Sequence, residues 1–239
     1  QHYLETEYPH RLVQIHLPAL DQELSKAFID EMIGSEVLPQ ETQSLIIEKS
    51  EGNPYYIQEL IRSLIADNVL IRREVSDEEA EGTEHWHATQ AVTAINLPDS
   101  LQSLLMARID RLSSDQQRVL QIAAVIGSVF WSDVLSHLAQ PETTSLKSKL
   151  TALQRGQFIT ERGRTSNLGI EYVFKAKLIR DAAYESLLKP QRKSYHLQIA
   201  QYLEDRLRQE QTSSQARSVA YGSLAHHYRQ AGRLDKELQ

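Results

Sequence analysis

The stretch that decides how this chain is interpreted runs from Ser50 to Leu60 and reads Ser-Glu-Gly-Asn-Pro-Tyr-Tyr-Ile-Gln-Glu-Leu. Gly52 and Pro54 end whatever structure precedes them. Pro54 biases Asn53 toward an extended backbone, and it suits the first position of a new helix, where its missing N–H costs nothing. The apolar spacing that follows predicts an amphipathic helix, whose stripe is Ile57, Leu60, Ile61, Leu64 and Ile65.

This proline-fixed corner has a structural and a functional interpretation. The structural one is an ordinary helix start, because Gly and Pro often punctuate helices. The functional one is that free backbone N–H groups of the first turn point outward and can meet an anion. The sequence around the corner favours the functional interpretation.

Four blocks of sequence, in one order, carry a resemblance to a known family. The first is Glu51-Gly52-Asn53-Pro54 with the aromatic pair and the Glu-Leu that follow it. The others are Leu97–Leu112, which opens Leu-Pro-Asp-Ser, then Val119–Gly127 and Leu178–Leu188. Together they resemble the STAND-type signalling ATPases, large bacterial predicted ATPases that are often joined to nucleotide cyclase, kinase or transcription-regulator modules. The resemblance covers nearly the whole chain.

The resemblance implies which residues of the corner meet a nucleotide. In that family the proline of the Gly-x-Pro corner lies in a helical lid and touches the bound nucleotide. Gly52, Asn53 and Pro54 are therefore the expected nucleotide contacts of the lid.

The chain departs from the family after the segment that matches the wing of a winged helix. Relatives place a histidine there against the ADP phosphates, whereas this chain reads Phe-Lys-Ala-Lys-Leu, with Ala176 in the histidine position. Alanine can neither donate to a phosphate nor pair with its charge. Either this chain lacks the contact that the histidine makes with the phosphates, or Lys175 or Lys177 replaces the histidine as a flexible cation. We expect a weaker ADP-locked state.

Composition limits the class of protein. The 239 residues are 41% apolar and 24% charged, as in an ordinary globular protein, and the net charge of −6 argues against a surface that coats nucleic acid. The absence of cysteine excludes disulfides and thiolate metal sites. No apolar run approaches membrane-spanning length and no signal-peptide pattern opens the chain, so we expect a cytoplasmic protein without membrane contact.

The sequence has no Gly-x-x-x-x-Gly-Lys-Ser/Thr loop and begins at Gln1, so we expect an excised piece of a longer protein. This piece alone is not expected to hydrolyse ATP. The resemblance implies that the parent binds ATP or ADP with magnesium, mostly through residues outside this chain.

A mainly α fold with five parts is predicted from the element pattern and the resemblance. The parts are the tail of a preceding NTPase core at 1–20, a three-helix lid at 21–68, a hairpin with an acidic loop at 69–97, a winged helix at 98–189, and the start of a tetratricopeptide-like helical array at 190–239.

Some details of these parts are open to direct comparison with a structure. The first lid helix is expected to bury a stripe of Leu24, Ala27, Phe28 and Met32. Capping boxes are possible at Ser113 with Gln116 or at Ser114 with Gln117, and Ser132 is expected to cap a short helix. Pro141 is expected to begin another helix, and 162–167 a loop between two strands.

Two histidine pairs raise the question of a metal site. His85 and His87 share one face of a predicted strand on either side of Trp86, but no third ligand is within sequence reach, so we favour a solvated hairpin face. His226 and His227 are adjacent on a predicted helix and point in different directions, which does not favour a metal either.

A winged helix also raises DNA binding as an alternative. The cations in the recognition and wing positions are Lys147, Lys149, Arg155, Arg162 and Arg164. Glu142 and Glu161 interrupt them and the chain is acidic, so a solvated face on an intramolecular domain is favoured.

The sequence therefore predicts the regulatory half of a signalling ATPase. ADP between core and lid would clamp the winged helix, and exchange for ATP, coupled to a signal on the helical array, would release it. Expected partners are the preceding P-loop core, the following helical-repeat sensor and a second copy of the protein. The alternatives are a DNA-binding winged-helix regulator and an interaction module with no nucleotide role.

Overall fold

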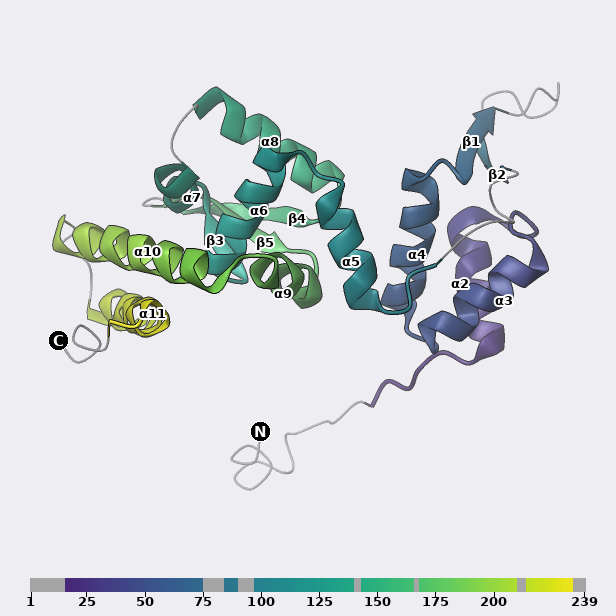
Figure 1. Cartoon of the computed structure of the whole chain (residues 1–239), viewed down its shortest axis with the longest axis horizontal. Helices are drawn as coiled ribbons and strands as arrows, with labels where there is room; N and C mark the ends of the chain where they lie inside the picture. Colours follow the sequence, from purple (N-terminus) through teal and green to yellow (C-terminus); the bar gives the residue numbers. More distant parts are fainter. Residues whose placement is uncertain are drawn as a thin grey trace. The chain divides into compact units, whose positions relative to one another are not determined.

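The computed structural model describes residues 16–74, 84–89, 97–139, 143–165, 168–209 and 214–233. This part of the chain is mainly helical with two small antiparallel sheets, which confirms the predicted mainly α class (Figure 1). The chain divides into two compact units, Gln1–Leu101 and Gln102–Gln239. Among the described residues, no helix combines the length and the apolar character needed to cross a membrane.

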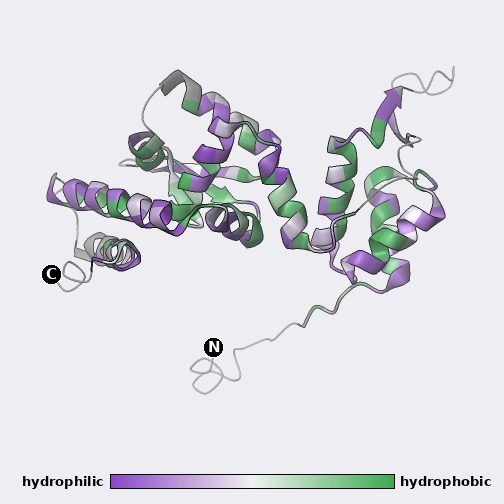
Figure 2. Cartoon of the chain, in the orientation of Figure 1, coloured by the Kyte–Doolittle hydropathy of each residue, from purple (hydrophilic) through white to green (hydrophobic). Residues whose placement is uncertain are grey.

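Three helices in the first unit confirm the prediction for residues 21–68. They are α2 (Gln22–Ile33), α3 (Gln40–Ser50) and α4 (Pro54–Ala66), and each packs against the other two. Hydrophobic residues run along much of α4 in Figure 2. Its buried apolar side chains include Ile57, Leu60 and Ile61, all with no exposed surface. Since burial of apolar surface is the main favourable term in folding, α4 is the centre of this unit.

The buried face of α2 differs from the expected one. Ser25, Ile29 and Ile33 are buried, whereas Leu24 is 55% exposed. The expected stripe was wrong because packing against α3 and α4 decides which side of α2 faces inward. Asp21 caps the helix and accepts a hydrogen bond from the Leu24 backbone N–H at 2.8 Å in its exposed first turn. Ser25 has no exposed surface, and a hydrophobic pattern does not reveal the burial of a serine.

The predicted hairpin after α4 is confirmed. Strand β1 (Leu70–Glu74) pairs antiparallel with β2 (Glu84–Ala88). Arg72 lies opposite Trp86, and its guanidinium carbon is 4.8 Å from the centre of the indole ring. The expected acidic loop at 77–82 lies outside the described residues.

The second unit surrounds a three-stranded antiparallel sheet of order β3-β5-β4. Aromatic contacts join two of these strands, because Phe130 stacks on Tyr172 with 5.6 Å between ring centres and lies tilted against Phe174 at 5.5 Å. In chain order its elements are α5 (Leu101–Asp110), α6 (Ser114–Ile126), β3 (Val129–Trp131), α7 (Ser132–Ala139), α8 (Thr143–Arg155), β4 (Ile159–Thr165), β5 (Gly169–Phe174), α9 (Lys177–Glu185), α10 (Lys189–Gln209) and α11 (Ser214–Ala231).

Helix starts in this unit are partly as predicted. Ser113 and Gln116 form the capping box of α6. Ser132 does not cap α7 from outside but is its first residue, and its hydroxyl accepts a hydrogen bond from the Ile170 N–H at 2.9 Å. The sheet therefore uses this hydroxyl to hold the start of α7. Pro141 lies outside the described residues.

The connection between β4 and β5 is shorter than predicted. Arg162 and Arg164 lie within β4 rather than in a loop, because the strand continues to Thr165. A register shift between Glu161 and Gly163 accommodates the extra residue, as in a β-bulge.

Candidate functional site

The corner that precedes α4 is clamped to the chain segment that enters this unit. The Leu20 N–H donates to the Gly52 carbonyl oxygen at 2.9 Å. Gly52 has φ +71°, and a Cβ there would lie 2.1 Å from the Leu20 carbonyl oxygen. Glycine is required at this position for both its backbone conformation and its lack of a side chain. Segment 16–20 and the corner are thus in direct backbone contact.

The first turn of α4 is closed by Asn53. The Asn53 Oδ1 accepts hydrogen bonds from the N–H groups of Tyr55 at 3.0 Å and Tyr56 at 3.3 Å. The Ile57 N–H donates to the Asn53 carbonyl, and Pro54 has no N–H. The expectation of free N–H groups was therefore wrong. The side chains of Asn53 and Pro54 remain exposed, so this corner can touch a neighbour through a proline ring and an amide.

Two of the resembling blocks meet in the first unit. The Tyr56 hydroxyl donates to the Pro98 carbonyl at 2.7 Å. Lys49 Nζ donates to the Leu97 carbonyl at 3.0 Å and lies 2.5 Å from Asp99 Oδ1. The hydrogen bond and charge of Lys49 lower the pKa of the Asp99 carboxyl, while burial raises the pKa of Tyr56. We call Lys49 and Tyr56 with segment 97–99 the connector latch.

Both blocks were identified from the sequence, but the contact between them was not predicted. The available signal was the Tyr56 hydroxyl, because a tyrosine on the buried face of a helix usually finds a hydrogen-bond partner.

A hollow of about 820 Å³ lies beside the corner, between α2, α3 and Gly52. Its charged lining is mostly acidic, with Lys26 the single base among Asp21, Glu23, Glu48 and Glu51. These four carboxylates would repel the negative charges of a polyphosphate. A nucleotide near this unit would need cations from elsewhere.

The second set of predicted site residues surrounds the start of α9. Ala176 is the N-cap residue, and it makes no side-chain capping bond. Lys175 and Lys177 on either side of it are exposed. A helix N-terminus without a side-chain cap attracts negative charge, and two ammonium groups strengthen that attraction. Gly52, Asn53 and Pro54 belong to one unit, and the two lysines belong to the other.

The histidine pairs lie in different environments. His85 and His87 are exposed on β2 beside the half-buried Trp86. His226 is exposed and His227 is buried, as their different directions predicted. Within the described part of the chain, no group of three or more His, Cys, Asp or Glu residues is arranged to hold a metal ion. Sequence reasoning missed that His227 meets His196 across two helices.

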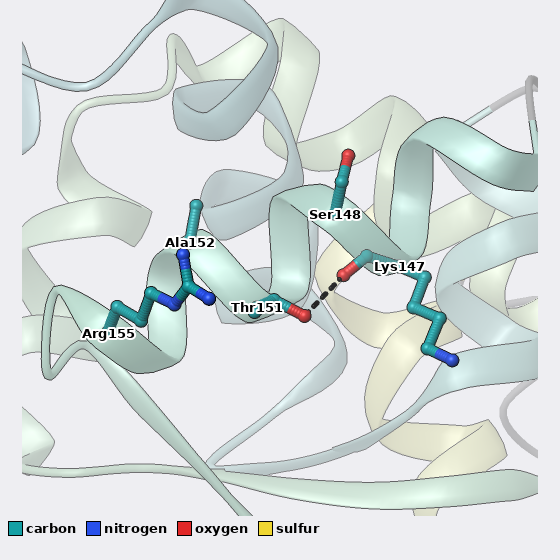
Figure 3. A pocket seen from close by; sticks show the side chains of 5 residues that line it. All are labelled: Lys147, Ser148, Thr151, Ala152 and Arg155. Carbon is teal, nitrogen blue, oxygen red and sulfur yellow. Dashed lines mark hydrogen bonds between the residues drawn. The ribbon is translucent and has the colours of Figure 1, made fainter.

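The cations proposed for DNA binding are only partly available. Helix α8 carries an open hollow of about 610 Å³, with Lys147 and Arg155 near its two ends and the Thr151 hydroxyl bonded to the Lys147 carbonyl (Figure 3). Lys149 is paired with Asp115 at 2.9 Å, and Arg162 lies 3.6 Å from Glu171. These two carboxylates therefore offset part of the positive charge that the sequence places on α8 and β4.

Comparison with known proteins gives one distant similarity. No family model matches the chain. The chain is similar to a protein of Rattus norvegicus named adenylate cyclase type 10, with 22% identity over 253 aligned residues. The alignment covers 75% of this chain and 16% of the rat protein, so the chain spans a small part of that relative's length.

Proposed function

We propose that this chain is the regulatory part of a STAND-type signalling ATPase, in which a helical lid and a winged helix respond to ADP or ATP in a preceding P-loop core. The backbone clamp between Leu20 and Gly52 carries the proposal. Segment 1–20 is the proposed tail of the core, and its described end meets the lid at Gly52, two residues before α4 begins. A movement of the tail would reach α4 through the peptide backbone, without an intervening flexible side chain.

The connector latch supports a path from the lid toward the second unit. Tyr56 is on α4 and holds Pro98 directly, so a rotation of α4 would pull on segment 97–99. That segment leads within a few residues to α5. The clamp, α4 and the latch thus form a continuous series of contacts, as coupling between a nucleotide and a distant domain requires.

The element order of the second unit supports a winged helix. A helix, a short strand, two helices and a hairpin follow one another from α6 to β5, and the short strand β3 pairs with β5. The hairpin β4–β5 would be the wing. In this proposal the winged helix contacts other parts of the same protein rather than DNA, because Lys149 and Arg162 are each paired with a carboxylate. DNA binding is the less favoured alternative for the same reason.

The start of α9 is the proposed phosphate contact of the ADP-bound state. Lys175 and Lys177 would supply the positive charge that a histidine supplies in the relatives, together with the N-terminus of the helix. Lysine is a flexible point charge, so the contact would be weaker and less directional. The nucleotide must bind the two arrangements unequally, by roughly a few kcal/mol, to move the switch.

The remaining parts of the proposal concern partners and output. Helices α10 and α11 pack on one another and would begin a helical-repeat sensor that needs further repeats. The parent would bind ATP or ADP with magnesium, reside in the cytoplasm and assemble with itself. The rat relative's name, an adenylate cyclase, supports a link to a nucleotide cyclase.

The test uses the longer protein that contains this chain and a P-loop core. Ala176→His should raise ADP affinity, by about fivefold to tenfold for one added charge-assisted hydrogen bond, as measured by calorimetry. Pro54→Ala should reduce the difference between the ADP and ATP states in hydrogen exchange of the winged helix. Pro39→Ala, a proline at the start of α3 in the same unit, is the matched control and should leave that difference unchanged.

Two results would overturn the proposal. One is ADP affinity that does not rise in Ala176→His. The other is a nucleotide response that is the same in Pro54→Ala and Pro39→Ala. Salt-dependent binding of duplex DNA by the chain would instead favour the DNA-binding alternative.

A further inference from the structure

Two buried histidines join the last two described helices. His196 of α10 and His227 of α11 are each 2% exposed, and their Nδ1 atoms are 2.8 Å apart. On its other side, the Nε2 of His196 lies 3.1 Å from the Tyr184 hydroxyl of α9. The contact between α10 and α11 is the most extensive between any two described elements. These rings are therefore central to how α11 is held.

The short distance between the two Nδ1 atoms has a simple chemical meaning. A hydrogen bond between two imidazole nitrogens needs one N–H donor and one lone pair, so at least one of the two rings must be neutral. A second proton would make both nitrogens donors and remove the lone pair between them. The contact thus excludes imidazolium at both His196 and His227 together, and the burial of the two rings opposes a charge on either one.

The surrounding groups oppose protonation as well. The charged groups that act on the rings, within the described residues, are Arg180 of α9 and His226 of α11, and both are basic. Burial, followed by these neighbours, lowers the pKa of His196 to about 4. Burial and the other two histidines lower the pKa of His227 to about 3.

Two basic groups from the other helices packed on α10 lie beside it, one from α7 and one from α6. His137 of α7 stacks on Tyr202 with 4.6 Å between ring centres. Arg118 of α6 lines a hollow with Ser194 and Gln198, which lie on a different face of α10 from His196. Neither helix supplies a carboxylate to these contacts that could stabilise a protonated ring.

We propose that the His196–His227 pair is a proton-sensitive latch that holds α11 on α10 at neutral pH and releases it on acidification. Rings exposed by release would bind protons with an ordinary pKa of about 6.5, whereas the packed rings do not. A lowered pKa in the packed state means that its stability is complete above about pH 6.5 and falls as the pH drops toward the packed-state values. Acid therefore favours the released helix.

The size of the effect follows from the same linkage. Between pH 7.5 and 5.5 each ring should raise the equilibrium constant for release about tenfold, and the two together about 100-fold. This range contains the pH values at which histidine acts as a physiological switch. The histidine latch requires no nucleotide, so its test is independent of the proposed ATPase role.

Hydrogen exchange of the whole chain, followed by mass spectrometry, tests the latch. After correction for the intrinsic pH dependence of exchange, amides of the described α11 segment 221–231 should lose about 100-fold of their protection between pH 7.5 and 5.5. Amides of α6 should not change. In His227→Asn, whose amide can replace the Nδ1 contact without titrating, the loss should be about tenfold. His137→Gln, a histidine outside the pair, should behave as wild type.

Equal protection of α11 at both pH values would overturn the proposal, and so would a full 100-fold loss in His227→Asn. If that variant leaves α11 unprotected at every pH, ¹⁵N NMR of the imidazole rings in the wild-type chain provides the test. Both buried rings should remain neutral at pH 6 while α11 is protected. A ring that protonates near pH 6.5 with α11 still in place would also refute the latch.

Discussion

Helices α4 and α9 both begin with residues that the sequence marked as a nucleotide contact, yet the two helix starts differ in physical character. At α4, Asn53 Oδ1 takes the N–H groups of Tyr55 and Tyr56. At α9, Ala176 offers no acceptor, and exposed Lys175 and Lys177 stand on either side. One start is closed by its own side chain and held by backbone contact, whereas the other is open and positively charged.

The difference separates two ways of responding to a neighbour. A closed start with a fixed glycine and an exposed proline ring responds to the shape and position of a neighbour, because its first-turn N–H groups are already hydrogen-bonded. An open start responds to charge, because N–H groups and ammonium ions are available to an anion. In the proposed switch, α4 would transmit the position of the core and α9 would detect the phosphate.

Replacement of the clamped glycine should produce the largest effect. Gly52→Ala forces a left-handed φ and places Cβ 2.1 Å from the Leu20 carbonyl oxygen, so segment 16–20 or the corner must move. We expect the free energy of unfolding of the first unit to fall by about 3 kcal/mol or more. Urea unfolding, with hydrogen exchange of α4 amides to identify the unit, measures this change.

Gly34→Ala is the matched control in the same unit. Gly34 has φ +93°, but its Cβ would meet only the Val37 side chain at an ordinary 3.5 Å. Its cost should be about 1–3 kcal/mol, from backbone conformation alone, because its ψ of 154° lies in a region that essentially only glycine adopts. Equal losses in the two variants would show that the backbone clamp at Leu20 contributes nothing beyond the conformation of a glycine.

Removal of the α4 cap should have an intermediate effect. Asn53→Ala leaves two N–H groups without their acceptor, and we expect a loss of about 1–2 kcal/mol in the same unfolding experiment. Asp21→Ala removes a cap from α2 that accepts a single hydrogen bond, and it should cost about 0.5–1 kcal/mol. If Asn53→Ala costs less than Asp21→Ala, water replaces the cap and the start of α4 is effectively open.

The contrast between these helix starts also shows how far the sequence alone could lead. The start of α4 at Pro54 and the hairpin β1–β2 were predicted correctly, and the capping box of α6 is one of the two that the sequence allowed. The helix start and the capping box depend on residues a few positions apart, and the hairpin joins two strands that are neighbours in the sequence. Asn53 was assigned to a nucleotide, although asparagine before a helix is among the best caps, and that local signal was overlooked. Rules that use only residues close in sequence would have been sufficient to predict the cap at Asn53.

Contacts between distant residues were beyond such rules. The Tyr56–Pro98 bond joins residues 42 positions apart, and the histidine pair joins residues 31 apart. Periodicity places His196 and His227 on their helices, but it does not say which faces meet. The burial of Ser25 in place of Leu24 has the same origin, because the packing of neighbouring helices decides which stripe is inward.

The smallest predicted effect is a gain in stability at α9. Ala176 has φ −144° and ψ 147°, an extended backbone that suits an N-cap, so Ala176→Ser should add an acceptor for the first-turn N–H groups without strain. We expect the second unit to gain about 0.5–1 kcal/mol, seen as a higher urea midpoint. Ala176→Val keeps the extended backbone but adds no oxygen, and it should give no gain. Equal midpoints for Ser and Val would mean that the start of α9 is already satisfied, and the contrast with α4 would then rest on Lys175 and Lys177 alone.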